Sequence, residues 1–116
     1  MKNINVKDLH EKIQSGEIKT KFVIDVRTKA ENESEKIADT ILIPLNELQN
    51  KDLDFNKNDS LYIYCATGNR SQIACHLLKT QGFDNCYNVD GGISAWKRQG
   101  FEIEKGEKKS VFGFFG

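Results

Sequence analysis

The residues of this chain whose types and spacing best suit catalysis are Cys65, Gly68 and Arg70. They follow an apolar run at 61–64 and precede a helical pattern at 71–80. This order predicts that Cys65 lies at the carboxyl end of a strand, facing backbone N–H groups that lack partners at the positive end of a helix dipole. A thiol in that position ionises near neutral pH and becomes a nucleophile. Gly68 lets the backbone turn its amides toward the sulfur, and Arg70 adds planar cationic donors for an oxyanion. The sequence therefore predicts an active site at this loop.

The elements that must position the loop follow from an alternation of strand and helix patterns. Strands are expected at 4–6, 22–26, 41–43, 61–64 and 86–89, and helices at 8–13, 45–48, 71–80 and 93–99. This alternation is typical of an α/β fold with a parallel sheet covered by helices on both faces. In such a sheet, ligands bind beyond the carboxyl ends of the strands. Asp25, Cys65 and the segment at 90–92 all fall at such ends, which agrees with a site there.

Three motifs resemble those of one known family in their order and spacing. They are Cys-Ala-Thr-Gly-Asn-Arg at 65–70, Asp-Val-Arg at 25–27 and Asp-Gly-Gly-Ile-Ser-Ala-Trp at 90–96. On these motifs the chain resembles the rhodanese-like family, the single-domain sulfurtransferases, over roughly residues 4–104. The expected domain spans residues 1–104, which leaves 105–116 as a C-terminal tail. The resemblance implies a rhodanese-like α/β fold, with a central five-stranded parallel sheet and helices on both faces.

The chain departs from the family pattern in one stretch. Family members usually carry Gly-His-Ile-x-Gly-Ala before an Ile-Pro pair, whereas this chain has Glu-Lys-Ile-Ala-Asp-Thr at 35–40. Asn32 stands where the family usually has an aromatic residue. Because the loop at 65–70 is intact, this departure concerns the support beside the site more than the chemistry.

The resemblance implies sulfur transfer by double displacement, as in thiosulfate:cyanide sulfurtransferases. The Cys65 thiolate attacks the sulfane sulfur of a small donor such as thiosulfate, sulfite leaves, and an acceptor then takes the sulfur from the Cys65 persulfide. The acceptor is a thiol or a protein cysteine, or cyanide in an assay. The persulfide anion is expected to be stabilised by a cradle of loop amides. The candidate binding residues are Ala66, Thr67, Gly68, Asn69 and Arg70. No metal and no organic cofactor is implied.

Five further residues are expected to support the site, namely Asp25, Arg27, Ser71, Gly91 and Gly92. Asp25 and Arg27 are interpreted as a buried ion pair or as capping groups, with a direct role in substrate binding as the alternative. The two glycines are expected to mark a tight turn that packs close to the active loop.

Two other functions stay open on the sequence. Rhodanese-fold phosphatases and arsenate reductases use a longer loop between cysteine and arginine, which accommodates a tetrahedral oxyanion. Here four residues separate Cys65 from Arg70, a spacing that fits a sulfur atom better. The other alternative is a persulfide carrier or regulatory protein-binding module, which would keep Cys65 but show little turnover with thiosulfate. This alternative stays open because fold and motif alone do not fix a cellular role.

Composition agrees with a small enzyme of one domain. The length of 116 residues falls within the usual range of about 100–150 residues for a domain. The 17 basic and 17 acidic residues balance, which gives no support to binding of nucleic acid or an acidic membrane. No apolar run approaches the ~20 residues of a membrane helix, and the first residues lack a signal-peptide core. A cytoplasmic location is therefore expected, and the oligomeric state is not indicated.

Three cysteines without a paired spacing indicate free thiols in a reducing compartment. Cys75 and Cys86 are interpreted as buried structural thiols, with a resolving role toward oxidised Cys65 as the alternative. The tail carries three phenylalanines in its last five residues, which could pack onto the domain, contact another protein or fray. The sequence leaves these three possibilities open.

Overall fold

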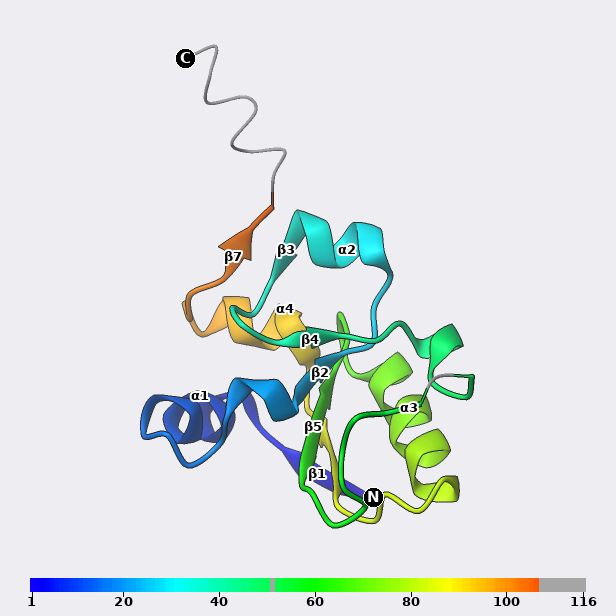
Figure 1. Cartoon of the computed structure of the whole chain (residues 1–116). Coiled ribbons are helices and arrows are strands. Elements are labelled where there is room, and N and C mark those ends of the chain that lie inside the picture. The colour runs from blue at the N-terminus through cyan, green and yellow to red at the C-terminus, as the bar shows by residue number, and fades with distance from the viewer. Residues whose placement is uncertain (51, 107–116) are drawn as a thin grey trace.

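Strands and helices alternate along residues 1–50 and 52–106, the part of the chain that the computed structural model describes (Figure 1). In chain order, the strands and α-helices are β1 (Lys2–Ile4), α1 (Val6–Gln14), β2 (Val23–Asp25), α2 (Lys29–Ser34), β3 (Glu35–Lys36), β4 (Ile41–Leu42), β5 (Leu61–Tyr64), α3 (Asn69–Thr80), β6 (Cys86–Val89), α4 (Gly92–Arg98) and β7 (Glu104–Lys105). The 3₁₀ helices η1 (Thr20–Phe22) and η2 (Leu45–Glu47) precede β2 and follow β4. None of the described helices is long and apolar enough to cross a membrane.

The central sheet of the described chain has five parallel strands in the order β1-β6-β5-β2-β4. Its five parallel strands and flanking helices confirm the predicted fold class. β5 lies in the middle, paired with β2 and β6, and Asp25 of β2 is in register with Tyr64 of β5. Because the strands are parallel, β2, β5 and β6 end at one edge of the sheet, where Cys65 and the segment at 90–92 follow.

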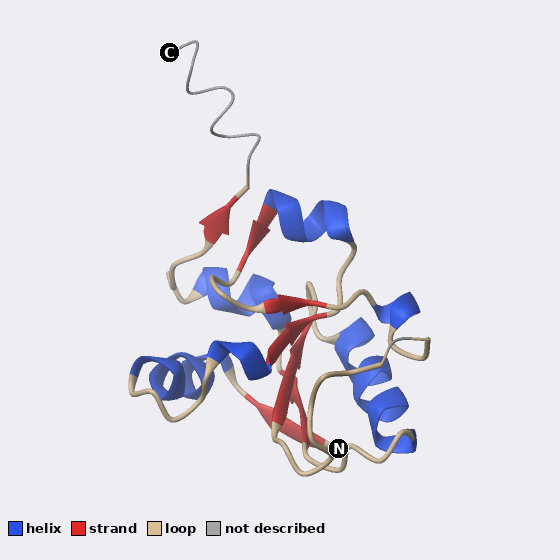
Figure 2. Cartoon of the chain, in the orientation of Figure 1, coloured by secondary structure: helices blue, strands red, loops and turns tan. Residues whose placement is uncertain are grey.

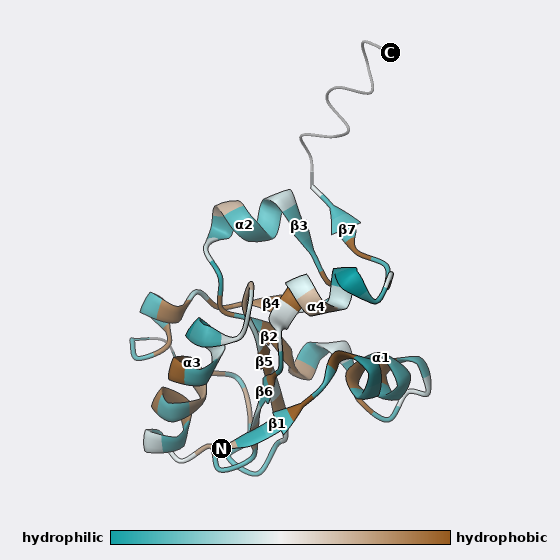
Figure 3. Ribbon diagram, turned by 180° about the vertical axis from the view of Figure 1, so that it is seen from behind, coloured by the Kyte–Doolittle hydropathy of each residue, from teal (hydrophilic) through white to brown (hydrophobic). Residues whose placement is uncertain are grey.

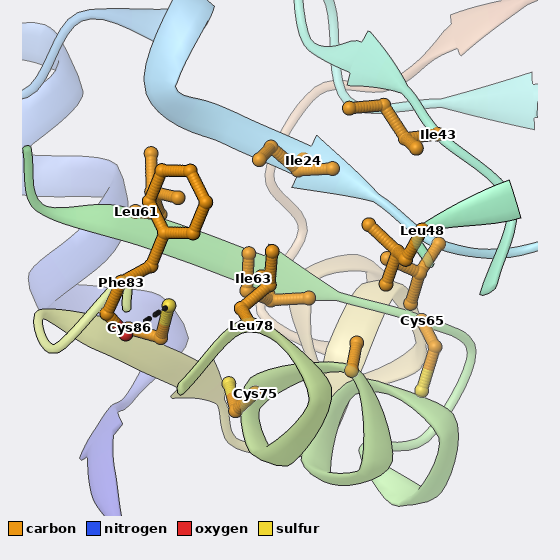
Figure 4. Close-up of a cluster of buried hydrophobic side chains, with 12 residues drawn as sticks. Ile24, Ile43, Leu48, Leu61, Ile63, Cys65, Cys75, Leu78, Phe83 and Cys86 are labelled. Atoms are coloured by element: carbon orange, nitrogen blue, oxygen red, sulfur yellow. Dashed lines mark hydrogen bonds between the residues drawn. The ribbon is translucent and has the colours of Figure 1, made fainter. Parts of the chain in front are cut away.

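Helices cover both faces of the sheet (Figure 2). Each face has its own hydrophobic core. On one face Leu78 of α3 and Leu48, next to η2, pack with Ile63 (Figure 4). On the other face the core includes Leu9 of α1 and Trp96 of α4. Hydrophobic residues concentrate on the central strands (Figure 3), as expected for inner strands buried on both sides. This two-sided packing fixes the sheet edge on which the candidate site is built.

The first strand lies two residues earlier in the chain than the pattern at 4–6 predicts. It spans Lys2–Ile4, and the prediction of strand at Val6 is wrong because α1 begins there. Asn5 caps this helix, since its side-chain oxygen accepts a hydrogen bond from the backbone N–H of Asp8 at 2.8 Å. A local cap therefore outweighs the β-branched character of the valine.

Sequence patterns do not predict α2, β3 or β7. None of the α2 residues is buried, so this helix has no apolar periodicity; a capping box of Thr28 and Glu31 fixes its start. β3 and β7 form a two-stranded antiparallel ribbon that pairs Glu35 with Lys105. The phenylalanine-rich part of the predicted tail, at 107–116, lies outside the described residues.

Candidate active site

Cys65 directly follows β5, and its sulfur lies beside the start of α3 (Figure 4). The backbone N–H groups of Gly68 and Ser71 donate to Sγ at 3.1 and 3.4 Å, and the Ser71 hydroxyl lies 3.4 Å from the same sulfur. Gly68 is the N-cap with φ of +109°, a conformation that glycine adopts without strain. The helix begins at Asn69, earlier than the predicted start at 71, and its first N–H groups are free of intrahelical partners.

The surroundings of the Cys65 thiol favour its thiolate form. Burial opposes ionisation, because only 1% of the residue is exposed. Hydrogen bonds from the Ser71 hydroxyl and from backbone N–H groups of the loop outweigh burial, so the pKa of the thiol lies below its ordinary value. By contrast, burial raises the pKa of Cys75 to about 12 and that of Cys86 to about 11. Cys65 is therefore the thiol best prepared for nucleophilic attack.

The start of α4 holds the cysteine loop from the other side. The backbone N–H groups of Ile93 and Ser94 donate to the carbonyl oxygens of Cys65 and Ala66 at 2.9 and 3.0 Å. With these carbonyls directed at α4, other N–H groups of the loop are free to point at the sulfur. Two parts of the chain that are distant in sequence thus fix the orientation of one short loop.

The paired glycines before this helix allow the close approach. Gly91 and Gly92 have φ of +76° and +57°. A Cβ on Gly92 would lie 2.3 Å from the carbonyl oxygen of Cys65, and one on Gly91 would lie 2.6 Å from the Cβ of Ala95. The expected tight turn against the active loop is what the structure contains.

Ser71 connects the nucleophile to a buried polar side chain that the sequence patterns do not single out. Its hydroxyl, fully buried, lies within hydrogen-bond distance of the Gly68 carbonyl at 3.1 Å and of Oδ1 of Asn88. The amide nitrogen of Asn88 donates to Asn3 at 3.2 Å and to Asp90 at 3.5 Å. A polar residue inside the apolar run at 86–89 was the available signal, because an asparagine buried in a strand needs partners. The network anchors the hydroxyl that faces Cys65.

Asp25 and Arg27 form the buried ion pair expected from the sequence. Nη2 of Arg27 lies 2.8 Å from Oδ2 of Asp25, and the two side chains are 4% and 0% exposed. Arg27 also donates to the carbonyl oxygen of Glu35 at 2.7 Å, and Asn32 donates to Asp25 at 3.0 Å. These bonds join the end of β2 to α2 and β3, so the pair builds the wall of the site and does not bond to the Cys65 loop.

Arg70 is held by an acidic partner that lies 39 residues earlier in the chain. Its Nη1 and Nη2 donate to Oε1 and Oε2 of Glu31 at 2.7 and 2.9 Å, a bidentate pair. The Arg70 hydrogen bond is the largest influence on Glu31 and, with those from Thr28, lowers the pKa of its carboxyl to about 2. Sequence reasoning missed Glu31, although Thr28 and Glu31 have the spacing of a capping box.

The remaining loop residues border solvent. Thr67 and Asn69 are exposed, and Ala66 is half-buried. Their side chains form the outer rim of the loop, while its backbone contacts the sulfur. Among the described residues, no group of three or more His, Cys, Asp or Glu side chains is placed to hold a metal ion.

This geometry agrees with a comparison against protein-family models, in which residues 5–99 match the rhodanese-like domain. The chain belongs to the rhodanese-like family. Among its relatives, a sulfurtransferase of Allochromatium vinosum is 36% identical over 82 residues, which cover 71% of this chain and 77% of that protein. A Bacillus subtilis protein, YrkF, named as a proposed sulfur carrier, is 34% identical over 93 residues, covering 80% of this chain and 49% of that protein.

Solved structures of the family share the fold closely. A rhodanese-like domain protein of Staphylococcus aureus is 36% identical, superposes with a TM-score of 0.78, and covers 92% of this chain and 100% of its own. The present chain spans about half the length of the Bacillus subtilis relative, at 49%, and only 20% of the length of another relative. Family membership therefore concerns this domain, and the functions of the longer proteins are not carried over with it.

Within the rhodanese-like frame, the unusual stretch at 35–40 still contributes to the fold. Ile37 is 3% exposed in the core, and its backbone N–H donates to the hydroxyl of Tyr64 at 3.3 Å. The Thr40 hydroxyl lies 2.9 Å from that same hydroxyl. Asn32, in place of the usual aromatic residue, binds the Asp25 carboxylate. The substituted stretch therefore supports the site through polar contacts.

Proposed function

We propose that this rhodanese-like protein is a sulfurtransferase that moves a sulfane sulfur atom through a persulfide on Cys65. The observation that carries the proposal is the position of Sγ, which accepts N–H hydrogen bonds from Gly68 and Ser71 within a loop whose ends are fixed by β5 and α3. Donors arranged around a sulfur stabilise negative charge before attack, and the same donors can stabilise a terminal persulfide anion.

The reaction has two displacements. In the first, the Cys65 thiolate attacks the outer sulfur of the donor, the donor's S–S bond breaks, and the leaving group departs with the bonding electron pair. With thiosulfate the leaving group is sulfite, and with an organic persulfide it is a thiolate. In the second, a thiol, a protein cysteine or cyanide attacks the terminal sulfur of the Cys65 persulfide, which releases the Cys65 thiolate again.

Intact-mass spectrometry of the reduced protein after incubation with thiosulfate or cysteine persulfide tests the first step. We expect a gain of about 32 Da, one sulfur atom, in the wild type and no gain in Cys65→Ser. Cys86→Ser is the matched control, because it also replaces one buried thiol by a hydroxyl that can still donate to the Phe83 carbonyl. A sulfur gain in Cys65→Ser equal to that of the wild type would refute the role of Cys65.

A non-turnover persulfide carrier is the second candidate function, and the likeness to the Bacillus subtilis protein YrkF favours it. Release of thiocyanate on addition of cyanide separates the two candidates. Repeated thiocyanate formation supports the enzyme, whereas a single sulfur gain without turnover supports the carrier. The acceptor, thiosulfate as a donor and the cytoplasmic location stay predictions.

A further inference from the structure

The cation of the candidate active loop is occupied by a carboxylate of the same chain. Arg70 and Glu31 form their bidentate pair with side chains 36% and 34% exposed, at the rim of the site. The Glu31 side chain is held in place, because Thr28 donates to its Oε1 from both the backbone N–H and the hydroxyl, each at 3.1 Å. Two donors of Thr28 and two of Arg70 therefore hold the Glu31 carboxylate in one position.

Arg27, a second arginine at this edge of the sheet, is also paired. Arg27 is committed to Asp25 and to the carbonyl oxygen of Glu35 within the fold. The Cys65 thiolate, Arg70 and Glu31 together carry one negative charge, beside the positive start of α3. Because Glu31 neutralises the charge of Arg70 and takes two of its five N–H donors, the paired Arg70 attracts an approaching dianion less than an unpaired arginine would.

The surface beside Arg70 also fits an organic group better than a small inorganic ion. Arg70 lines a cavity whose other lining residues include the apolar Pro44, Leu45 and Leu77 and the polar Thr28, Asn46 and Gln49. Apolar side chains favour carbon-bearing ligands, because they cannot replace the hydration of a compact anion.

From these observations we propose that Glu31 determines the donor specificity of the site and disfavours dianionic thiosulfate relative to organic persulfides. In an organic persulfide, an organic R–S group takes the place of the anionic sulfonate that thiosulfate carries next to its sulfane sulfur. The inference rests on the proposed sulfur transfer through Cys65. In the favoured reaction the Cys65 thiolate attacks the outer sulfur of R–S–SH, forming the Cys65 persulfide, and the R–S⁻ thiolate leaves with the electron pair of the broken S–S bond. The organic group R lies over the cavity next to Arg70.

Glu31→Gln tests this proposal, because a glutamine oxygen can still accept the Thr28 hydrogen bonds while the negative charge on Arg70 is lost. Glu33→Gln is the matched control, since it removes the same charge from an exposed residue of the same helix that pairs with Lys29. The measurement is kcat/KM for sulfur loading from thiosulfate and from cysteine persulfide in each variant.

We expect Glu31→Gln to raise kcat/KM for thiosulfate about tenfold, the scale of one hydrogen bond to a charged group. The value for cysteine persulfide should change less than about threefold, and Glu33→Gln should leave the ratio of the two donors as in the wild type. The proposal is overturned if the wild type already prefers thiosulfate, or if both donors change in parallel in Glu31→Gln.

Binding of thiosulfate to Cys65→Ser, with and without Glu31→Gln, gives a readout that needs no turnover. A Kd about tenfold lower in the double variant supports the role of Glu31 even if neither donor loads the wild type, in which case only the sulfur-transfer proposal fails. If both donors load the wild type but Glu31→Gln changes neither the donor ratio nor this Kd, the inference about Glu31 fails and the sulfurtransferase stands.

Discussion

Replacement of Gly92 by alanine should damage both the stability of the fold and the reactivity of Cys65. The new Cβ would lie 2.3 Å from the Cys65 carbonyl oxygen and 2.7 Å from that of Ala66, whereas ordinary contact begins at 3.4 Å. The loop must therefore shift by about 1 Å to relieve the contact. This shift strains the hydrogen bonds that Ile93 and Ser94 donate to the loop.

The expected loss of unfolding free energy in Gly92→Ala has two contributions. An alanine with φ of +57° costs about 1–2 kcal/mol in backbone conformation at Gly92. Each of the two strained backbone hydrogen bonds adds about 0.5–1.5 kcal/mol. We expect Gly92→Ala to lower the free energy of unfolding by roughly 2–5 kcal/mol in urea titrations. Because a displacement of about 1 Å at a reacting group can cost about 100-fold, we expect a comparable fall in the rate of sulfur loading of Cys65.

Gly100→Ala is the matched control for this prediction. Gly100 follows the same helix with φ of +79°, but a Cβ there would meet no atom within 4 Å. This variant should therefore lose only the conformational contribution, about 1–2 kcal/mol, and should load sulfur at the wild-type rate. Equal losses of stability and equal loading rates in the two alanine variants would refute the argument that Gly92 is required by the loop of Cys65.

Two further predictions concern ionisation. In the folded protein near neutral pH, iodoacetamide should alkylate Cys65 first, because the pKa values of Cys75 and Cys86 are raised to about 12 and 11. If exposure controlled the reaction, the order would be reversed, since Cys65, Cys75 and Cys86 are 1%, 4% and 7% exposed. Peptide mapping of the alkylated protein distinguishes the two orders. Because Arg70 holds the pKa of Glu31 near 2, below the ordinary 4.5, its stabilisation is complete above pH 4.5 and is lost as the pH falls toward 2. Urea unfolding at several pH values should show that Glu31→Gln loses less stability than the wild type as the pH falls through this window. If the free energy of unfolding fell equally with pH in the two proteins, the pairing would be contradicted.

The strands of the central sheet and the position of the nucleophile could be predicted because they depend on short stretches of sequence. The apolar run at 61–64 and the pattern after it place Cys65 between a strand and a helix without information from elsewhere in the chain. Short polar elements could not be found in the same way. α2 contains no buried residue, so it has no apolar period to detect. β3 and β7 have two residues each and lie about seventy positions apart in the chain, so their pairing leaves no local pattern either.

The sequence by itself determined the family, the fold class and the candidate nucleophile, because the Cys65 loop, the strand ends and the paired glycines are local features with fixed spacing. Only the tertiary structure decided the electrostatics of the site. Glu31 reaches Arg70 across 39 positions, and Asn88 reaches Ser71 across 17, so both contacts depend on how α2 and β6 are placed against the start of α3. Side-chain charge acts through space, and the chain order alone does not state which carboxylate lies over which guanidinium.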